Sequence, residues 1–172
     1  MAGHLTFVLG GAASGKSALA ERLVLKTGLA PLYIATAQAF DHEMEEKIAR
    51  HIAARGPRWL TVEAPHDLAA AVEAVPSDHA ILIDCLTLWL TNRLLAEADI
   101  EAAESAFFAA LAKCEAPVVI VSNEVGQGIV PDNALSRRFR EAQGRLNIRS
   151  AVRADTVVQV VAGLPNVLKG AL

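Results

Sequence analysis

The sequence predicts an α/β protein in which a mostly parallel β-sheet is flanked by helices. Short apolar runs alternate with longer segments of helical spacing along the chain. The runs at 80–83 and 117–121 are apolar at nearly every position, which is typical of strands covered on both faces. The length of 172 residues suits one compact domain. We therefore expect a single domain over residues 1–172.

The alternation places each element in order. Strands are expected at residues 4–9, 31–35, 80–84, 117–122 and 156–161. Helical spacing runs through residues 16–27, 42–55, 65–74, 86–96, 101–113 and 131–153. Sheets of this kind bind ligands beyond the carboxyl ends of their strands, so the loops after the strands are the expected place of the chemistry.

The composition excludes several classes of protein. Of the residues 53% are hydrophobic, but 33 of them are alanines, which are small and common on helices. No apolar run reaches the roughly 18 residues that span a membrane, and the N-terminus lacks the basic region of a signal peptide. The net charge of −3 gives no support to nucleic-acid binding. We expect a cytoplasmic protein with no membrane span and no nucleic-acid partner.

The two cysteines carry no metal or redox signature. Cys85 and Cys114 lie beside apolar residues and outside any CxxC or Cys/His spacing. We interpret them as small buried hydrophobic residues in a reducing compartment.

A glycine-rich loop directly after the first strand is the strongest motif. It matches GxxxxGK[ST] and consists of Gly10, Gly11, Ala12, Ala13, Ser14, Gly15, Lys16 and Ser17. The glycines let successive backbone amides face phosphate oxygens, Lys16 adds a cation at the β- and γ-phosphates, and Ser17 is placed to bind Mg²⁺. A plain glycine turn is the alternative, but the strand before the loop and the helix after it favour a phosphate-binding P-loop.

Asp84 ends the apolar strand at 80–84 and is the best candidate for the second magnesium residue. A carboxylate after four apolar residues is costly in a core unless its charge is used. P-loop enzymes use an acid at such a position to organise the metal. The alternative role is an N-cap for the helix that begins near Leu86.

His51 stands on the charged helical segment 42–55, at the border of its apolar stripe and between Arg50 and Arg55. A lone helical histidine is most often a packing or surface residue. The two arginines are equally consistent with phosphate contacts and with a solvated helix face.

The order of motifs around these residues resembles a known family. The P-loop is followed by Tyr33-Ile-Ala-Thr-Ala37, Ile48-Ala-Arg-His51, Trp59-x-Thr-Val-Glu63, Asp84-Cys-Leu-Thr-Leu-Trp-Leu-Thr-Asn92, Ser122-Asn-Glu-Val-Gly-x-Gly-Ile-Val-Pro131 and Asn147. This series, from Leu5 to about Gly163, closely resembles the bifunctional adenosylcobinamide kinases / adenosylcobinamide-phosphate guanylyltransferases of cobalamin biosynthesis. The resemblance implies a RecA-like P-loop NTPase domain and a homotrimer.

The resemblance also implies two reactions. ATP or GTP phosphorylates the aminopropanol hydroxyl of adenosylcobinamide, with Mg²⁺ as cofactor. GTP then donates GMP to adenosylcobinamide phosphate through a guanylyl-histidine, giving adenosylcobinamide-GDP. In this family the guanylylated residue is the His of the Ile-x-x-His motif, which is His51 here. An imidazole with a pKa of about 6.5 offers a free lone pair near neutral pH.

Residues expected to contact nucleotide follow from the same resemblance. Beyond the P-loop they are Ala35, Thr36, Ala37, Ile52, Ala53, Ala54, Arg55, Glu63 and Asp84. Glu63 has the carboxylate needed to accept the N1 and N2 protons of guanine. One residue departs from the family pattern, because many members carry Arg where this chain has Ala13.

Two other functions are compatible with part of the sequence. A generic small-molecule P-loop kinase needs only the P-loop and Asp84, and a non-catalytic regulatory module would keep the P-loop for nucleotide affinity. The glycine-hinged loop 123–131 fits a substrate or subunit contact as well as an ordinary turn. We expect most arginines of the helix at 131–153 to be solvated or at a subunit boundary.

Overall fold

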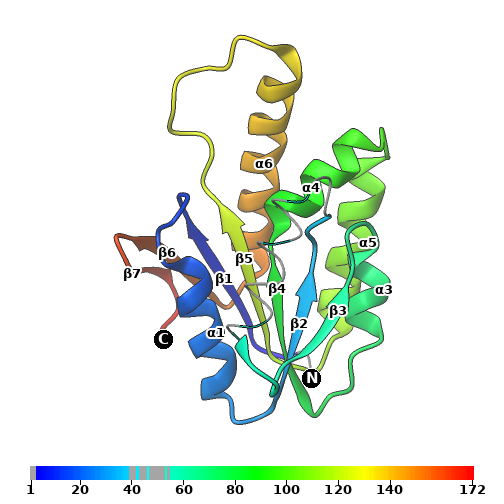
Figure 1. The fold of residues 1–172 in the computed structure, drawn as a ribbon, viewed down its shortest axis with the longest axis vertical. Coiled ribbons are helices and arrows are strands. Elements are labelled where there is room, and N and C mark those ends of the chain that lie inside the picture. Colours follow the sequence, from blue (N-terminus) through cyan, green and yellow to red (C-terminus); the bar gives the residue numbers. More distant parts are fainter. Residues whose placement is uncertain (1–2, 39–41, 43–45, 47–52, 54) are drawn as a thin grey trace.

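The computed structural model describes residues 3–38, 42, 46, 53 and 55–172. Its strands form one sheet with the order β3-β2-β4-β5-β1-β6-β7 (Figure 1). The strands are β1 (Leu5–Gly10), β2 (Ala30–Ala35), β3 (Leu60–Glu63), β4 (His79–Asp84), β5 (Val118–Asn123), β6 (Thr156–Val161) and β7 (Leu164–Lys169). The helices are α1 (Lys16–Lys26), α3 (Leu68–Glu73), α4 (Leu86–Leu95), α5 (Ile100–Lys113) and α6 (Ala134–Arg153).

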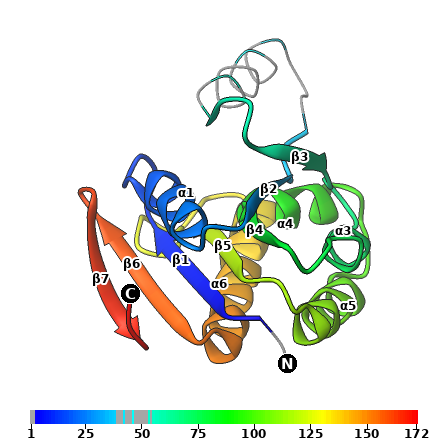
Figure 2. The same cartoon turned by 90° about the horizontal axis from the view of Figure 1, so that it is seen from below.

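The predicted α/β architecture is confirmed. Every neighbouring pair of strands is parallel except β6 and β7, which are antiparallel. Helix α1 covers one face of the sheet, and α3, α4, α5 and α6 cover the other (Figure 2). The core is divided accordingly, since Leu19 and Val24 of α1 pack with Val8, whereas Trp89 of α4 and Phe107 of α5 pack on the opposite face.

Side-chain caps set where three helices begin. Asp67, Asp99 and Asn133 precede α3, α5 and α6, and each accepts a hydrogen bond from the backbone N–H three residues later, at 3.0, 3.0 and 2.8 Å. A cap satisfies one of the unpaired N–H groups of the first turn. Helices α3 and α6 therefore each start three residues later than apolar spacing predicts.

Two strands differ from the prediction. β3 is not among the five strands expected above, and it pairs in parallel with β2 at the edge of the sheet. β7 was not expected; Leu164–Lys169 contains Pro165, and every residue of it is exposed in the structure. Proline is tolerated on an edge strand, and the pairing with β6 gives this segment its structure. The helix expected at 42–55 lies mostly outside the described residues.

No helix within the described ranges combines the length and the apolar character needed to cross a membrane. Both cysteines are free, with Cys85 buried and Cys114 half-buried. Their packing against apolar neighbours agrees with the structural interpretation of these residues.

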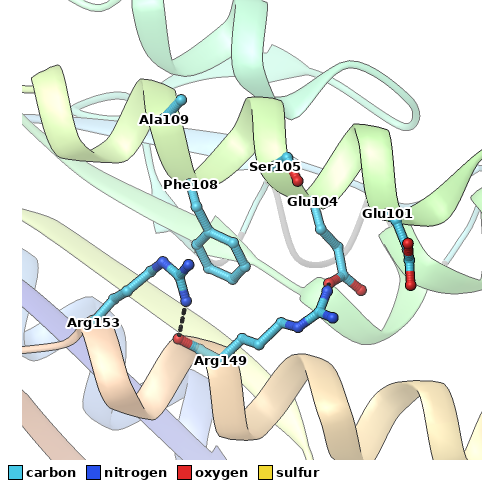
Figure 3. Close-up of a pocket in the computed structure, with 7 residues that line it drawn as sticks. All are labelled: Glu101, Glu104, Ser105, Phe108, Ala109, Arg149 and Arg153. Atoms are coloured by element: carbon cyan, nitrogen blue, oxygen red, sulfur yellow. Dashed lines mark hydrogen bonds and ion pairs between the residues drawn. The ribbon is translucent and has the colours of Figure 1, made fainter.

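Helices α5 and α6 are joined by charged side chains on the face away from α1 (Figure 3). The carboxylate of Glu104 on α5, 3% exposed, pairs with the guanidinium of Arg149 on α6. Next to this pair, the guanidinium of Arg153 lies 4.2 Å from the ring centre of Phe108. These groups line a cavity of about 440 Å³ between the two helices. They fasten the C-terminal half of α6 to α5.

The two partners of this ion pair are expected to differ in their effect on stability. Arg149→Met leaves a buried carboxylate without its partner and should lower the free energy of unfolding by about 3 kcal/mol. Glu104→Gln should cost only about 1 kcal/mol, because the Arg149 side chain is 42% exposed and turns to water. Urea unfolding of both variants measures the difference, and the double variant should be more stable than Arg149→Met alone. Equal losses in the two single variants would contradict this account.

Candidate active site

The carboxyl ends of four parallel strands meet at one edge of the sheet. In the strand register, Gly10 of β1 lies opposite Asn123 of β5, Val121 of β5 opposite Asp84 of β4, and Asp84 opposite Ala35 of β2. The structure therefore gathers the P-loop, Asp84, the turn after β2 and the loop after β5 along one edge. This arrangement is the expected place for a ligand in an open parallel sheet.

The P-loop joins β1 to α1, as its motif predicts. Gly15 has φ of 92° and caps the N-terminus of α1, in a backbone conformation that favours glycine. At Gly10 an added Cβ would lie 2.5 Å from the Ser14 hydroxyl and 2.8 Å from the Val160 carbonyl oxygen, so no side chain fits there. Lys16 is buried, and its ammonium donates to the Gly11 carbonyl at 2.9 Å.

Ala13 also has a left-handed backbone, with φ of 52°. This conformation costs a residue with a Cβ roughly 1–2 kcal/mol, so the fold of the loop is enforced by its surroundings. Ala13 is exposed. The cradle that the P-loop forms is thus built by backbone groups, and the alanine at this position leaves the course of the loop intact.

The turn between β6 and β7 braces the P-loop. The Gly163 N–H donates to the Ser14 carbonyl at 2.8 Å, and a Cβ on Gly15 would lie 3.1 Å from Gly163 Cα. The hydroxyl of Ser14 is buried without a hydrogen-bond partner among the described residues. Nothing in the P-loop motif indicates this brace, because the turn lies almost 150 residues further along the chain.

Asp84 occupies the position that the sequence predicts, at the carboxyl end of β4. It does not cap α4, whose N-cap is Cys85 with no side-chain cap bond. Ala80 and Leu82 pack on the α1 face of the sheet, and side chains alternate along a strand, so Asp84 lies on the same face as the P-loop helix. Burial, and after it the negative charge of Asp84, raises the pKa of the Cys85 thiol to about 11.

Thr36 lies at the site, and its side chain bonds to the backbone of the neighbouring turn. Its hydroxyl donates to the Cys85 carbonyl at 2.7 Å and accepts from the Cys85 N–H at 2.8 Å. Asn92 of α4 donates to the Thr36 carbonyl at 2.8 Å. The buried Thr36 side chain therefore fixes the turns after β2 and β4 relative to each other.

Arg55 lies over the ring of Tyr33 on β2, which also contacts Trp59, the residue before β3. Its guanidinium carbon is 3.4 Å from the ring centre of Tyr33, and Trp59 meets the Tyr33 ring edge-on at 6.4 Å. Burial is the main cause that raises the pKa of Tyr33, and the nearby Asp84 carboxylate adds to it. The Nε of Arg55 is buried and has no hydrogen-bond partner within the part of the chain that the structure describes. Sequence reasoning did not identify the stacking of Arg55 on Tyr33.

The site is elongated along the sheet edge. Glu63 ends the edge strand β3 and is exposed, and four strand spacings of about 4.8 Å separate β3 from β1, which makes about 19 Å. The P-loop thus lies at one end of the edge, and Glu63 with Arg55 at the other. Ala53 is exposed. His51, Ile52 and Ala54 lie outside the described residues.

The residues proposed for magnesium offer suitable ligands. Ser17 at the start of α1 and Asp84 on the same face supply a hydroxyl and a carboxylate oxygen. Mg²⁺ in such enzymes is bound by one or two protein oxygens, substrate phosphates and water. Groups of three or more His, Cys, Asp or Glu side chains placed to hold a metal are absent from the described residues. The donor set therefore fits an ion that binds together with a nucleotide.

The arginines at the start of α6 have partners that the sequence did not indicate. Arg140 donates to the carbonyls of Gly126 and Gly128, and Arg137 donates to those of Pro131 and Asp132. Arg149 pairs with Glu104, as described above. Arg137 is nevertheless exposed and the Arg149 side chain is 42% exposed, so the expectation that most arginines of this helix are solvated or at a subunit boundary stays a prediction. Arg137 and Arg140 fasten the loop after β5 to α6.

The comparisons with known proteins agree with these features. A family model described as cobinamide kinase / cobinamide phosphate guanyltransferase matches residues 6–168. The bifunctional adenosylcobalamin biosynthesis protein CobP of Pseudomonas aeruginosa is 46% identical over 166 residues, covering 95% of this chain and 96% of that protein. The protein CobU of Salmonella typhimurium is 43% identical over 178 residues, and that of Escherichia coli 39% over 176, each covering 93% of this chain and 97% of that protein.

Among solved structures, a RadB recombinase matches with a TM-score of 0.48 and 20% identity, covering 92% of this chain and 74% of that chain. The family model and the three relatives extend over nearly the whole chain, including the P-loop, Asp84 and the loop after β5. The chain therefore belongs to the cobinamide kinase / cobinamide phosphate guanyltransferase family.

Proposed function

We propose that the protein catalyses two consecutive reactions. It phosphorylates the aminopropanol hydroxyl of adenosylcobinamide with ATP or GTP, and it then transfers GMP from GTP to adenosylcobinamide phosphate to give adenosylcobinamide-GDP. The observation that carries the proposal is the P-loop between β1 and α1, with buried Lys16 and Asp84 on the same side of the sheet edge. Membership of the family supports the choice of substrates.

In the kinase reaction the hydroxyl oxygen attacks the γ-phosphorus, the bond to the β-phosphate oxygen breaks, a nucleoside diphosphate leaves, and the hydroxyl proton is released to solvent. The P-loop amides and Lys16 bind the phosphates and stabilise the charge that develops on the transferred group. Ser17 and Asp84 would hold Mg²⁺, which neutralises charge on the β- and γ-phosphates when bound. Positioning and charge stabilisation supply most of the catalysis in reactions of this class.

In the second reaction an imidazole nitrogen of His51 attacks the α-phosphorus of GTP, and pyrophosphate leaves. A phosphate oxygen of adenosylcobinamide phosphate then attacks the same phosphorus, the nitrogen–phosphorus bond breaks, and free His51 is restored. We assign the binding of GTP to the P-loop residues, the backbone turn Ala35, Thr36 and Ala37, and Ile52, Ala53, Ala54, Arg55, Glu63 and Asp84. Glu63 accepts the guanine N1 and N2 protons, and the exposed carboxylate at the end of β3 is free of the core for this task.

We also propose that the protein is a homotrimer in the cytoplasm. Exposed apolar side chains support an association of copies, since Ile129 is 97% and Val130 63% exposed on the loop after β5. An apolar groove between α4 and the first turns of α6 is lined by Leu94, Leu95, Leu135 and Phe139 among others. Large exposed apolar patches mark interaction surfaces. Sedimentation velocity measures the mass in solution, and a monomer would refute the trimer.

Product analysis tests the two activities directly. The protein, adenosylcobinamide, Mg²⁺ and GTP are incubated, and mass spectrometry follows adenosylcobinamide phosphate and adenosylcobinamide-GDP. Both products are expected in that order. Adenosylcobinamide phosphate without adenosylcobinamide-GDP would favour a small-molecule kinase. Nucleotide binding without either product would favour a regulatory module.

A further inference from the structure

Asn123 lies between the two halves of the proposed kinase site. β5 is the single strand between β1 and β4, and its last residue, Asn123, is the register partner of Gly10 at the start of the P-loop. Parallel neighbours lie about 4.8 Å apart. Val119 and Val121 pack on the α1 face, so the alternation of side chains places Asn123 on that same face, together with Asp84.

Three elements fix the backbone around Asn123. The Asn123 N–H donates to the Thr87 hydroxyl of α4 at 2.8 Å, and its carbonyl accepts from Asn147 of α6 at 3.2 Å. The next N–H, that of Glu124, donates to the Gly10 carbonyl at 3.0 Å. The main chain at this position is therefore held from the P-loop, from α4 and from α6 at once.

A buried polar cluster stands behind it on the opposite face of β5. Ser122 donates to the Asn147 carboxamide oxygen at 2.7 Å, and Gln143 donates to both Ser122 and Asn147 at 2.9 Å. Ser122 and Gln143 are fully buried, and the carboxamide oxygen of Gln143 has no partner among the described residues. An unpaired buried polar atom costs about 1–3 kcal/mol. Apolar side chains would join α6 to β5 without that cost, so the cluster is better explained by the position that it fixes.

The carboxamide of Asn123 itself makes no hydrogen bond to any residue that the structure describes. It is half-buried, its backbone is fixed, and it stands in the interval between Lys16 and Asp84. If Lys16 and a metal at Asp84 both approach the γ-phosphate, as the proposed function requires, that phosphate lies within this interval. A carboxamide N–H₂ is a neutral donor suited to a phosphate oxygen.

We propose that the side chain of Asn123 donates to the γ-phosphate of the nucleotide in the kinase step, and that Asn147 and Gln143 are positioning residues that fix it. This inference rests on the proposed kinase activity and adds a residue that distinguishes a triphosphate from a diphosphate. Because the group in transfer gains charge at its oxygens, a preorganised donor at this position also stabilises the transition state.

Nucleotide binding tests the contact without the corrinoid substrate. Calorimetry measures the affinity of each variant for GDP and for a non-hydrolysable GTP analogue with Mg²⁺. Asn123→Ala should weaken binding of the triphosphate analogue about 10-fold and leave GDP affinity unchanged, which corresponds to one lost hydrogen bond to a charged group. Asn166→Ala, an exposed asparagine on β7, is the matched control and should bind both nucleotides as the unaltered protein does.

Kinase rates provide the second readout. Asn123→Ala should lower kcat for phosphorylation of adenosylcobinamide about 100-fold, the typical loss for one transition-state donor. If Asn123→Ala leaves both kcat and the ratio of triphosphate to diphosphate affinity unaltered, the inference about Asn123 is overturned, while the proposed kinase function is not. Failure of the unaltered protein to bind the triphosphate analogue, or to phosphorylate adenosylcobinamide, overturns the proposed function as well.

The positioning role needs a control within α6. Asn147→Ala should lower kcat about 10-fold while KM for adenosylcobinamide and the affinity for GDP stay unchanged. Ser150→Ala removes another buried polar side chain of the same helix, which donates to the Leu146 carbonyl at 2.8 Å within its own helix, and should leave kcat unchanged. Equal losses of kcat in the two variants, with equal losses of stability, would overturn the positioning role.

Discussion

His51→Ala is expected to leave no GMP bound to the protein after incubation with GTP labelled at the α-phosphate. The imidazole is the proposed attacking group, and alanine offers no lone pair to replace it. The formation of adenosylcobinamide-GDP should fall below detection, while adenosylcobinamide phosphate still accumulates, because the kinase step uses the P-loop. Label that is lost in acid and stable in alkali identifies the nitrogen–phosphorus bond in the unaltered protein.

His4→Ala serves as the control for this experiment. His4 lies at the amino end of β1, with a side chain 57% exposed, far along the strand from the P-loop. The His4→Ala protein should take up label as the unaltered protein does. Label of equal amount on His51→Ala, or none on the unaltered protein, would refute the guanylyl-histidine.

Lys16→Ala should lower kcat/KM for phosphorylation of adenosylcobinamide about 1,000-fold, or about 4 kcal/mol of transition-state stabilisation. The lysine is buried at the start of α1, where its ammonium now donates to the Gly11 carbonyl. No other cation among the described P-loop residues replaces it. Steady-state kinetics with ATP and with GTP measure the loss for each donor.

The matched control is Lys26→Ala in the last turn of the same helix, where the lysine is exposed. Its removal should change kcat/KM less than twofold. Thermal unfolding should separate catalysis from folding, since Lys16 contributes one hydrogen bond to its own loop and its loss should cost about 1 kcal/mol. A Lys16→Ala protein that folds and phosphorylates at the normal rate would refute the P-loop assignment.

Most of the fold follows from local patterns. The runs that became β1, β2, β4, β5 and β6 are apolar and bounded by turns, and both signals lie within a few residues. β7 could not be predicted in this way, because its proline and exposed residues become a strand only through pairing with β6. The starts of α3 and α6 differ from the prediction because Asp67 and Asn133 cap the N-termini of these helices, whereas apolar spacing continues before them.

The candidate site likewise has features that the sequence predicts and features that only the structure shows. The P-loop and Asp84 were predictable because their chemistry is written in a motif and in a charge at the end of an apolar strand. Contact between the turn Ala35, Thr36 and Ala37 and a nucleotide stays a prediction, and only the structure shows that the Thr36 hydroxyl bonds to the backbone of Cys85, 49 residues further along the chain. The backbone carbonyls bonded by Arg137 and Arg140, and the Glu104 partner of Arg149, likewise became visible only in the structure.

The sequence by itself determined the family, the alternation of strands and helices, and the loop whose glycines create a phosphate cradle. These are properties of residues close together in the chain, where backbone conformation is set locally. Only the tertiary structure decided that β5 lies between β1 and β4, and hence that Asn123 stands beside Gly10 and on the face of Asp84. The physical reason is that strand order depends on hydrogen bonds and packing between residues far apart in the chain, as in the pairing of Leu5 on β1 with Val118 on β5.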